Sequence, residues 1–154
     1  MRKGTLIYSV VLLLILGSAV ALMPAGAETV TGSAHFDPTK MDLMLPAPSV
    51  VKAMIRFPSD SPYTVKDINA STVLLEGSLP PDTTYHIPGA LVAEFDGEMF
   101  VNILWGIIYH MGVTEPPKKV WLTITGNLED TAGGIPFSAE GDIKPTVHHS
   151  PPPP

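Results

Sequence analysis

One stretch, residues 118–144, constrains the fold more than any other part of this chain, because it holds two alternating runs separated by a turn-rich segment. The first run places three apolar residues on one side: Val120, Leu122 and Ile124. Its other side carries Trp121, Thr123 and Thr125. The second run has a similar small or apolar side: Phe137, Ala139, Gly141 and Ile143. Such alternation predicts an antiparallel hairpin, which needs a second layer because an isolated hairpin is marginal in water.

The N-terminal leader has the three parts of a secretory signal peptide. Arg2 and Lys3 form a basic start, residues 6–16 are a nearly unbroken apolar run, and a small-x-small motif, Ala-Gly-Ala, ends at Ala27. Cleavage is predicted between Ala27 and Glu28, so that the mature chain is secreted. The apolar run is shorter than the roughly 20 residues that a membrane-spanning helix needs, and we expect no stable membrane insertion after cleavage.

Two alternatives keep the apolar run on the protein. If the weaker stretch as far as Met23 is counted, the leader is long enough to be an uncleaved membrane anchor. If the leader is instead cut after Gly4, in the manner of a pilin, the apolar segment packs as the core of a filament. The small-x-small motif before Glu28 favours secretion, because neither alternative needs that motif.

Composition narrows the possible partners and chemistry. The chain of 154 residues has a formal net charge of −6, and the leader holds basic residues but no acidic ones, so the mature chain is more acidic still. An acidic balance argues against nucleic acid and anionic membranes as partners. The chain has no cysteine, which excludes disulfides, thiol catalysis and thiolate metal sites. Its length suits a single domain.

The segments before the hairpin supply the expected second layer. Residues 28–35 are predicted to be a lead-in or an edge strand, and a turn follows at Asp37-Pro38, because proline fixes its own backbone and extends the residue before it. Alternation predicts strands in four later segments: residues 41–45, 50–57, 72–76 and 90–95. Two segments rich in turn formers are expected to be loops: residues 59–65 and 79–88.

The pattern changes to a helical period at residues 98–109. Apolar residues recur there at helical spacing: Phe100, Ile103, Leu104, Ile107 and Ile108. Asp96 suits the N-cap, and Gly112 suits the end of the helix. A strand at residues 99–105 is the alternative, because Gly106 weakens the helix. The consistent phase favours a helix, buried against the sheet or against a partner.

The resemblance of this chain to a known module rests on four segments: FDPTKMDLML, VVKAMIRFPSDSPYTVKDINASTVLLEGSLPP, ALVAEFDGEMFVNIL and VWLTITGNLEDTAGGIPFSAEGDIK. They span residues 36–144 and resemble the secreted immunoglobulin-like module of archaeal and bacterial extracellular proteins, which is sometimes found beside dockerin-type repeats. The resemblance implies an all-β, antiparallel immunoglobulin-like sandwich with one short helix between strands, and a non-catalytic spacer or adhesion role. Residues 145–154 follow as a proline-rich tail, for which we expect polyproline II structure or disorder.

The chain departs from this module in one loop. The module often carries an acidic Asp-x-Asp-x-Asp-Gly loop, suited to calcium, before the strand that leads into the helix. Residues 85–89 stand in that place here and read Tyr-His-Ile-Pro-Gly. This loop offers no carboxylates, and calcium sites are built from them, so no metal site is predicted here.

One face of the hairpin is the best candidate for binding. Trp121, Thr123 and Thr125 lie opposite the apolar residues, and an aromatic and hydroxyl row on a solvated sheet face can stack a sugar or dock a protein. The favoured interpretation, however, is that the helix at residues 98–109 or a loop covers this face. Trp121 would then belong to the core.

Other polar groups have simpler explanations. Asn69 begins an Asn-Ala-Ser sequon and is a candidate for N-glycosylation in a secreted protein. Glu140 and Asp142 share a strand face, roughly 7 Å apart, and are expected to be solvated charges and not a catalytic pair. Strand and helix phases scatter three further carboxylates: Glu94, Asp96 and Glu98. His148-His149 lie in the tail, where a metal would be held only loosely.

These observations predict a secreted, non-catalytic structural or interaction module at or outside the cell surface, with no cofactor. An extracellular protein or a glycan is the expected class of partner. Two alternatives remain. One is a carbohydrate- or ligand-binding module that uses Trp121 and its neighbouring threonines, and the other is a subunit that donates residues 28–34 to the open sheet edge of a neighbour.

Overall fold

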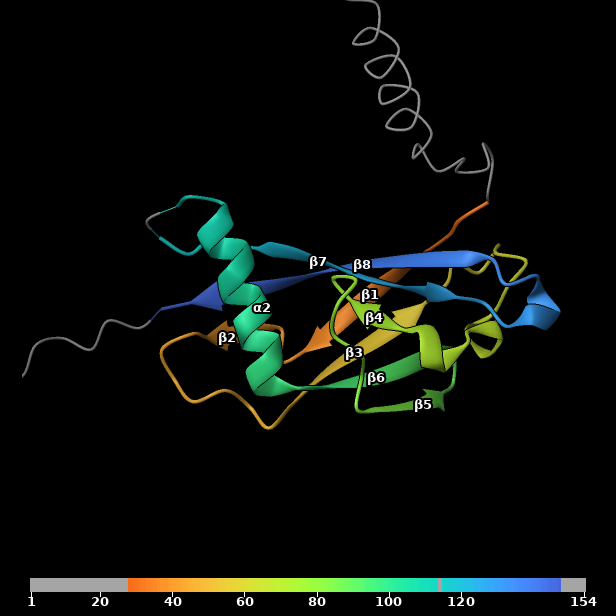
Figure 1. Ribbon diagram of the computed structural model, residues 1–154, viewed down its shortest axis with the longest axis horizontal. Helices are drawn as coiled ribbons and strands as arrows, with labels where there is room; N and C mark the ends of the chain where they lie inside the picture. The colour runs from red at the N-terminus through yellow and green to blue at the C-terminus, as the bar shows by residue number, and fades with distance from the viewer. Residues whose placement is uncertain (1–27, 114, 148–154) are drawn as a thin grey trace, which may run out of the picture.

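The computed structural model describes residues 28–113 and 115–147 (Figure 1). The predicted leader at residues 1–27 and residues 148–154 of the predicted tail lie outside the described residues. The described chain has one α-helix, α2 (Gly97–His110), and is otherwise mostly β. Its strands are β1 (Val30–Asp37), β2 (Lys40–Asp42), β3 (Val50–Arg56), β4 (Leu74–Leu75), β5 (Thr83–Ile87), β6 (Ala90–Asp96), β7 (Val120–Asn127) and β8 (Pro136–Thr146).

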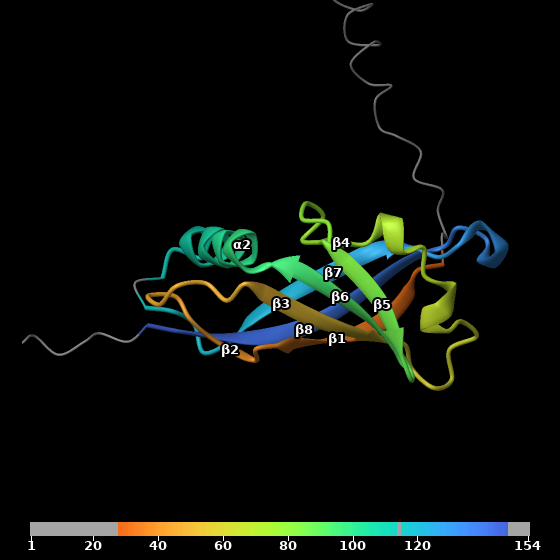
Figure 2. The same ribbon diagram turned by 90° about the horizontal axis from the view of Figure 1, so that it is seen from below.

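The strands form one curled sheet that mixes parallel and antiparallel pairs (Figure 2). Their order from edge to edge is β4-β7-β8-β1-β3-β6-β5, and β2 pairs with β8 beside this path. The predicted hairpin is confirmed, because β7 and β8 pair antiparallel along the whole of β7. The expectation that all pairing is antiparallel is wrong, because both β1 and β2 run parallel to β8.

β1 lies at the centre of the sheet, whereas the sequence predicts a lead-in or an edge strand at residues 28–35. The first half of β1 pairs with β8, and the second half pairs with β3. The sequence pattern does not reveal this central position, because the outward side chains of β1 are polar and exposed, as they often are in an edge strand. In this arrangement residues 30–33 would have to leave β8 before they could be donated to a neighbour, which counts against the strand-addition alternative.

β8 pairs with two strands, β1 and β2, along one of its edges. β1 pairs with its first part and β2 with its last part, and between them the chain turns at Asp37-Pro38, whose peptide bond is cis. Gly141 lies between these two parts. A Cβ atom on Gly141 would overlap the carbonyl oxygen of Ala34, so glycine is required where β1 passes this closely.

The concave side of the sheet holds the core, and α2 covers one end of it (Figures 1 and 2). Phe36 of β1 and Phe100 of α2 are both fully buried and pack edge to face, with their ring centroids 5.7 Å apart. Between β3 and β4, the chain covers more of this side with three buried residues: Val65, Ile68 and Val73. Burial of these apolar side chains is the main stabilising contribution of the fold.

The helix prediction is confirmed. Asp96 is the N-cap, and its Oδ1 accepts a hydrogen bond of 2.8 Å from the backbone N–H of Met99. Phe100, Leu104 and Ile108 fall on one side and are buried, as their spacing predicts. Gly112 follows the helix in a left-handed conformation, with φ of 64°.

Three short strands differ from the sequence expectation. β5 lies within residues that the pattern assigns to a loop, because an edge strand with exposed or half-buried side chains shows little alternation. β4 retains only two of residues 72–76, because Ala70–Thr72 forms a 3₁₀ turn capped by the Asn69 side chain. β2 similarly ends at Asp42, and Leu45 is exposed.

Candidate functional site

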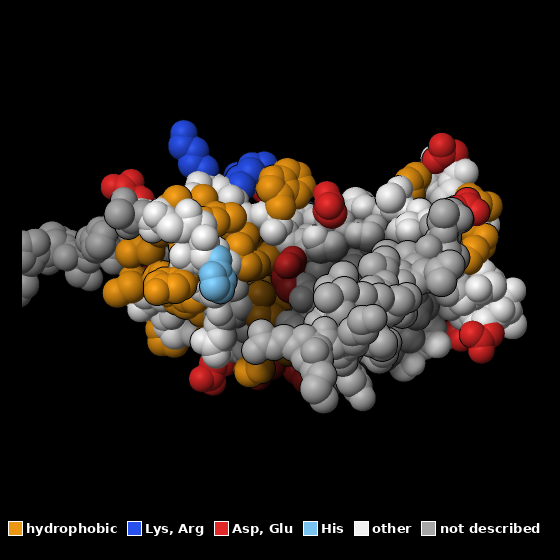
Figure 3. Space-filling model, turned by 45° about the horizontal axis from the view of Figure 1, so that its top comes forward, with side chains coloured by type: hydrophobic (Ala, Val, Ile, Leu, Met, Phe, Trp, Pro, Cys, Tyr) orange, Lys and Arg blue, Asp and Glu red, His pale blue; other side chains and the backbone are white. Residues whose placement is uncertain are grey.

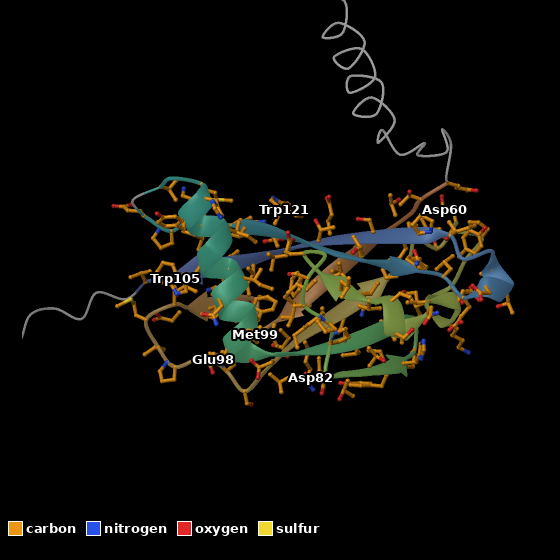
Figure 4. All side chains as sticks on the ribbon, in the orientation of Figure 1. Asp60, Asp82, Glu98, Met99, Trp105 and Trp121 are labelled. Carbon is orange, nitrogen blue, oxygen red and sulfur yellow. The ribbon has the colours of Figure 1, made fainter. Side chains whose placement is uncertain are left out.

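The convex side of the sheet is lined by polar side chains, and Trp121 of β7 lies on it (Figure 4). The side chain of Trp121 is 62% exposed, whereas Val120, Leu122 and Ile124 on the other side of the same strand are buried. Because α2 packs on the concave side, the interpretation that this helix covers Trp121 is wrong. The strand alternation correctly separates the two faces, but only the tertiary structure shows which face is covered.

Two charged residues frame the indole of Trp121. The ammonium group of Lys119 lies 5.9 Å from the centre of the Trp121 ring, within the range of a cation–π interaction. The same Nζ atom lies 3.1 Å from Oδ2 of Asp142, which is the cross-strand neighbour of Trp121 on β8. This arrangement holds Lys119 beside the ring and leaves much of the ring open to solvent.

Thr123 and Thr125 continue the same face along β7. Thr123 lies opposite Glu140 and Thr125 lies opposite Ser138, so hydroxyl and carboxylate groups line two adjacent strands. Trp121 and Thr125 are four residues apart on one strand, which corresponds to about 13 Å. A ligand that contacts all three predicted site residues must therefore be elongated along the strand.

Where β4 ends, Glu76 caps the edge of β7 beside this face. The backbone N–H of Glu76 donates to the carbonyl oxygen of Thr123 at 2.8 Å, and the Thr123 N–H donates to Oε1 of Glu76. Glu76 directly follows β4 and adopts a left-handed conformation, with φ of 50°, and its side chain bonds to Thr123 of the neighbouring strand β7. The carboxylate takes the place of a further strand residue and blocks pairing at Thr123.

A second polar cluster lies at the other end of the convex face. Lys52, Glu94 and Tyr85 come from three adjacent strands, with Lys52 Nζ 3.1 Å from Glu94 Oε1 and the Tyr85 hydroxyl donating to the same carboxylate at 3.2 Å. The hydrogen bond to Glu94, followed by that to Tyr85, raises the pKa of the Lys52 amine. A raised lysine pKa contributes stability that is lost only as the pH rises through that pKa, so the contribution of Lys52 does not change with pH near neutrality.

The other carboxylates considered in the sequence have individual structural roles. Asp96 caps α2, Glu94 pairs with Lys52, and Glu98 lies in the first turn of the helix. Glu140 and Asp142 do share the convex face, where Asp142 pairs with Lys119. Among residues 28–113 and 115–147, no group of three or more His, Asp or Glu side chains is placed to hold a metal ion.

A shallow groove lies away from the Trp121 face, between the β5–β6 turn and the chain that follows β3. Its larger part has a volume of about 590 Å³ and is lined by Thr64–Lys66 and His86–Gly89. His86 Nε2 lies 3.1 Å from the carbonyl oxygen of Val65, which fixes the ring at the wall. None of the residues that line this part of the groove carries a carboxylate.

Asn69, the glycosylation candidate, lies at the opposite end of β7 from Trp121. Its backbone N–H donates to the carbonyl oxygen of Asn127 at 2.9 Å, and Asn127 is six residues from Trp121, which corresponds to about 20 Å along the strand. Its Oδ1 accepts a hydrogen bond of 2.6 Å from the Ser71 hydroxyl. A glycan at Asn69 would thus be well separated from the Trp121 face.

Sequence reasoning found Trp121, Thr123 and Thr125 but missed Lys119 and Asp142 as neighbours of the indole. The available signal was the hairpin register, because pairing Val120 with Ile143 places Asp142 directly beside Trp121. That register is set by the conformation of the turn, and the eight residues between the two runs do not by themselves determine this conformation.

In the part of the chain that the structure describes, no helix has the length and apolar content needed to cross a membrane. Comparison of the chain with family models, with curated proteins and with solved structures finds no match.

Proposed function

We propose that this protein is a secreted, non-catalytic interaction module that binds an extracellular partner through the convex sheet face around Trp121. One observation carries the proposal: a tryptophan that is 62% exposed on the uncovered face of an otherwise well-packed sheet. Tryptophan is among the residues that dominate binding energy at interfaces, and its exposure has no role in the packing of this fold. Lys119, Asp142 and Thr123 supply polar contacts around it.

The charges on this face favour binding over catalysis. Lys119 and Asp142 pair with each other at the surface, where a general acid or base would need burial or a like charge to tune its pKa. Lys52 and Glu94 are paired in the same way. A rigid sheet that presents paired, solvated charges and one aromatic ring suits recognition of a partner.

The immunoglobulin-like relationship is part of the proposal. It is supported by the strand order, in which β1 joins two groups of strands, β4-β7-β8 and β3-β6-β5, that curl around one core. The position of α2 between β6 and β7, and the closing β7–β8 hairpin, agree with the segments that carry the resemblance. Modules of this architecture host many unrelated roles, so the function rests on the Trp121 face and not on the fold.

Secretion is tested by the N-terminus of the mature protein. Protein recovered from the culture medium of its native host is expected to begin at Glu28, which Edman sequencing and intact mass would show. A start at Thr5 or at Met1 would contradict secretion by signal-peptide cleavage and would support the filament or the membrane-anchor alternative. The same mass measurement reports any glycan, and Asn69→Gln is the control that should remove it.

Replacing Trp121 with alanine is expected to weaken binding to surface material of the host cell by roughly 30-fold, because an aromatic hot spot at the centre of an interface contributes about 2 kcal/mol. The free energy of unfolding should change by no more than about 0.5 kcal/mol, because the side chain is exposed. Co-sedimentation with cell-envelope fractions over a concentration series measures the first quantity, and urea unfolding measures the second.

Trp105→Phe is the matched control for this experiment. Trp105 is the only other tryptophan and is also exposed, but it lies on α2, away from the convex face. Binding that survives Trp121→Ala unchanged, or that falls equally in Trp105→Phe, would contradict the proposed site.

A carbohydrate is the second candidate for the partner at this face. The open ring of Trp121 beside the carboxylate of Asp142 and the hydroxyl of Thr123 offers both a stacking surface and hydrogen-bonding groups, as a sugar ring requires. In the Trp105→Phe background Trp121 is the single tryptophan, so soluble glycans that bind should change the tryptophan emission. A protein partner would give envelope binding without this response to free glycans.

A further inference from the structure

α2 carries two aromatic side chains on its exposed side that the packing of the fold does not use. Phe100, Leu104 and Ile108 point into the core. Trp105 (Figure 4) is 39% exposed, and Tyr109 is 81% exposed. Residues four positions apart are neighbours on a helix surface, with Cβ atoms about 5–6 Å apart. The two rings therefore form one exposed surface, which we call the aromatic pair of α2.

The described chain ends at the part of the molecule that α2 covers (Figure 1). Thr146, the last residue of β8, pairs with Asp42 of β2, and its carbonyl oxygen accepts a hydrogen bond of 2.9 Å from the N–H of Leu43. Val147 is half-buried and packs against the core. The position from which residues 148–154 continue is thus fixed by the fold.

The surface at this end of the molecule is apolar. Figure 3 shows hydrophobic side chains gathered at the end that carries α2. Met44 and Leu45, which directly follow Leu43, are exposed, and so is Met111 after the end of the helix. Exposed apolar surface gathered in one place marks a binding site in a soluble protein.

The composition of residues 148–154 suits an aromatic surface. They read His-His-Ser-Pro-Pro-Pro-Pro, and consecutive prolines favour an extended polyproline II helix. Proline has no N–H group to donate to a sheet edge. Polyproline II segments are instead bound through their rings by aromatic side chains. Because such a segment is ordered before it binds, its docking costs little conformational entropy.

The length and charge of this segment also fit α2. Residues 148–154 span about 22 Å as a polyproline II helix, and α2, with 14 residues, is about 21 Å long. Glu98 is exposed on the same helical stripe as Trp105 and Tyr109. Residues 148–154 contain no Asp or Glu, so they can lie along this stripe without bringing a carboxylate to Glu98. A second copy of α2 would bring its own Glu98.

From these observations we infer that residues 148–154 dock on α2 of their own chain, with the prolines at 151–154 packed against Trp105 and Tyr109. The contact is smaller than the roughly 800 Å² per partner of a stable interface between separate proteins. It suffices within one chain, because a short tether keeps the segment at a millimolar effective concentration. This contact is independent of the Trp121 face, which lies on the other side of the sheet.

The test compares ¹H–¹⁵N NMR spectra of the mature chain, residues 28–154, with those of a variant in which all four residues at 151–154 are replaced by serine. The indole N–H signal of Trp105 and the amide signal of Tyr109 should shift between the two proteins, because the prolines contact both rings. The indole N–H signal of Trp121 should stay in place and is the internal control. Trp105→Phe identifies which of the two indole signals is which.

Tyr109→Ser tests the aromatic pair itself. It should lower the equilibrium constant for docking by at least about fivefold, so the shift that the prolines cause at Trp105 should shrink accordingly. Tyr109 is exposed, and its replacement should leave the fold intact. Docking within one chain does not depend on protein concentration, so the Trp105 signal should be constant from about 0.05 to 1 mM.

Identical Trp105 signals with and without the prolines would overturn the inference, as would a proline-dependent shift that Tyr109→Ser leaves unchanged. A Trp105 shift that grows with protein concentration would assign the surface to a second copy. A shift that appears only on adding phosphatidylcholine vesicles would assign it to a lipid surface. Either result would also overturn docking of the tail. The serine variant retains Trp121 and should bind cell-envelope fractions like the wild type, so this test and that of the proposed function can fail separately.

Discussion

Replacing Gly141 with alanine is expected to lower the free energy of unfolding by about 3 kcal/mol, at the upper end of the usual cost of overpacking. The added Cβ would overlap the carbonyl oxygen of Ala34 and come within 2.9 Å of the Phe36 ring. A flexible side chain could move aside, but the Ala34 carbonyl is held in a strand that pairs on both sides. Relief therefore requires β1 and β8 to separate. Urea unfolding followed by circular dichroism would measure the loss.

The control for Gly141→Ala is the same substitution at Gly106. Added atoms there meet nothing outside the helix, so Gly106→Ala should stabilise the monomer by up to about 1 kcal/mol. Opposite signs at the two positions would show that the cost at Gly141 comes from the close approach of β1 and not from a general effect of alanine. Equal stability of Gly141→Ala and the wild type would contradict the central position of β1.

Replacing Phe36 with alanine is expected to cost about 3–5 kcal/mol, the range for a fully buried aromatic side chain. Phe36 is inaccessible to solvent and contacts Phe100, so its loss leaves a cavity between the sheet and α2. Because small domains have total stabilities of about 5–15 kcal/mol, Phe36→Ala can leave part of the population unfolded at room temperature. Phe36→Leu, which retains most of the volume, should cost less than about 1.5 kcal/mol and remain measurable.

A double-mutant cycle identifies the source of this cost. Combined Phe36→Leu and Phe100→Leu substitutions should be coupled by about 0.5–1.5 kcal/mol, because the two rings pack edge to face. His35→Ala, on the exposed side of β1, should change stability by no more than about 0.5 kcal/mol. Additive effects of the two phenylalanine substitutions would contradict the contact between β1 and α2.

The elements predicted best are those whose signal is local. The β7–β8 hairpin and α2 each show an apolar period over many residues, and α2 also has its N-cap at Asp96. β1 and β5 were harder to identify because their exposed sides are polar and their places depend on partners far along the chain. β1 is the clearest case: the sequence predicts a lead-in or an edge strand, but pairing with both β3 and β8 places it at the centre.

The candidate site divides in the same way. The alternation around Trp121 determines that its side chain lies on the opposite face of the strand from Leu122. The sequence does not show whether this face is covered, because the sheet face that a helix covers depends on the path of the chain between β6 and β7. The sequence favoured burial of Trp121, and the structure places α2 on the other side.

The sequence by itself therefore determined the hairpin, the helix with its cap and the division of each into polar and apolar sides, because these depend on neighbours within a few residues. Only the tertiary structure decided the parallel pairing of β1 and β2 with β8, the need for glycine at position 141, and the exposure of Trp121. These features depend on which distant segments meet, and such contacts are selected by the packing of the whole core and not by any local pattern.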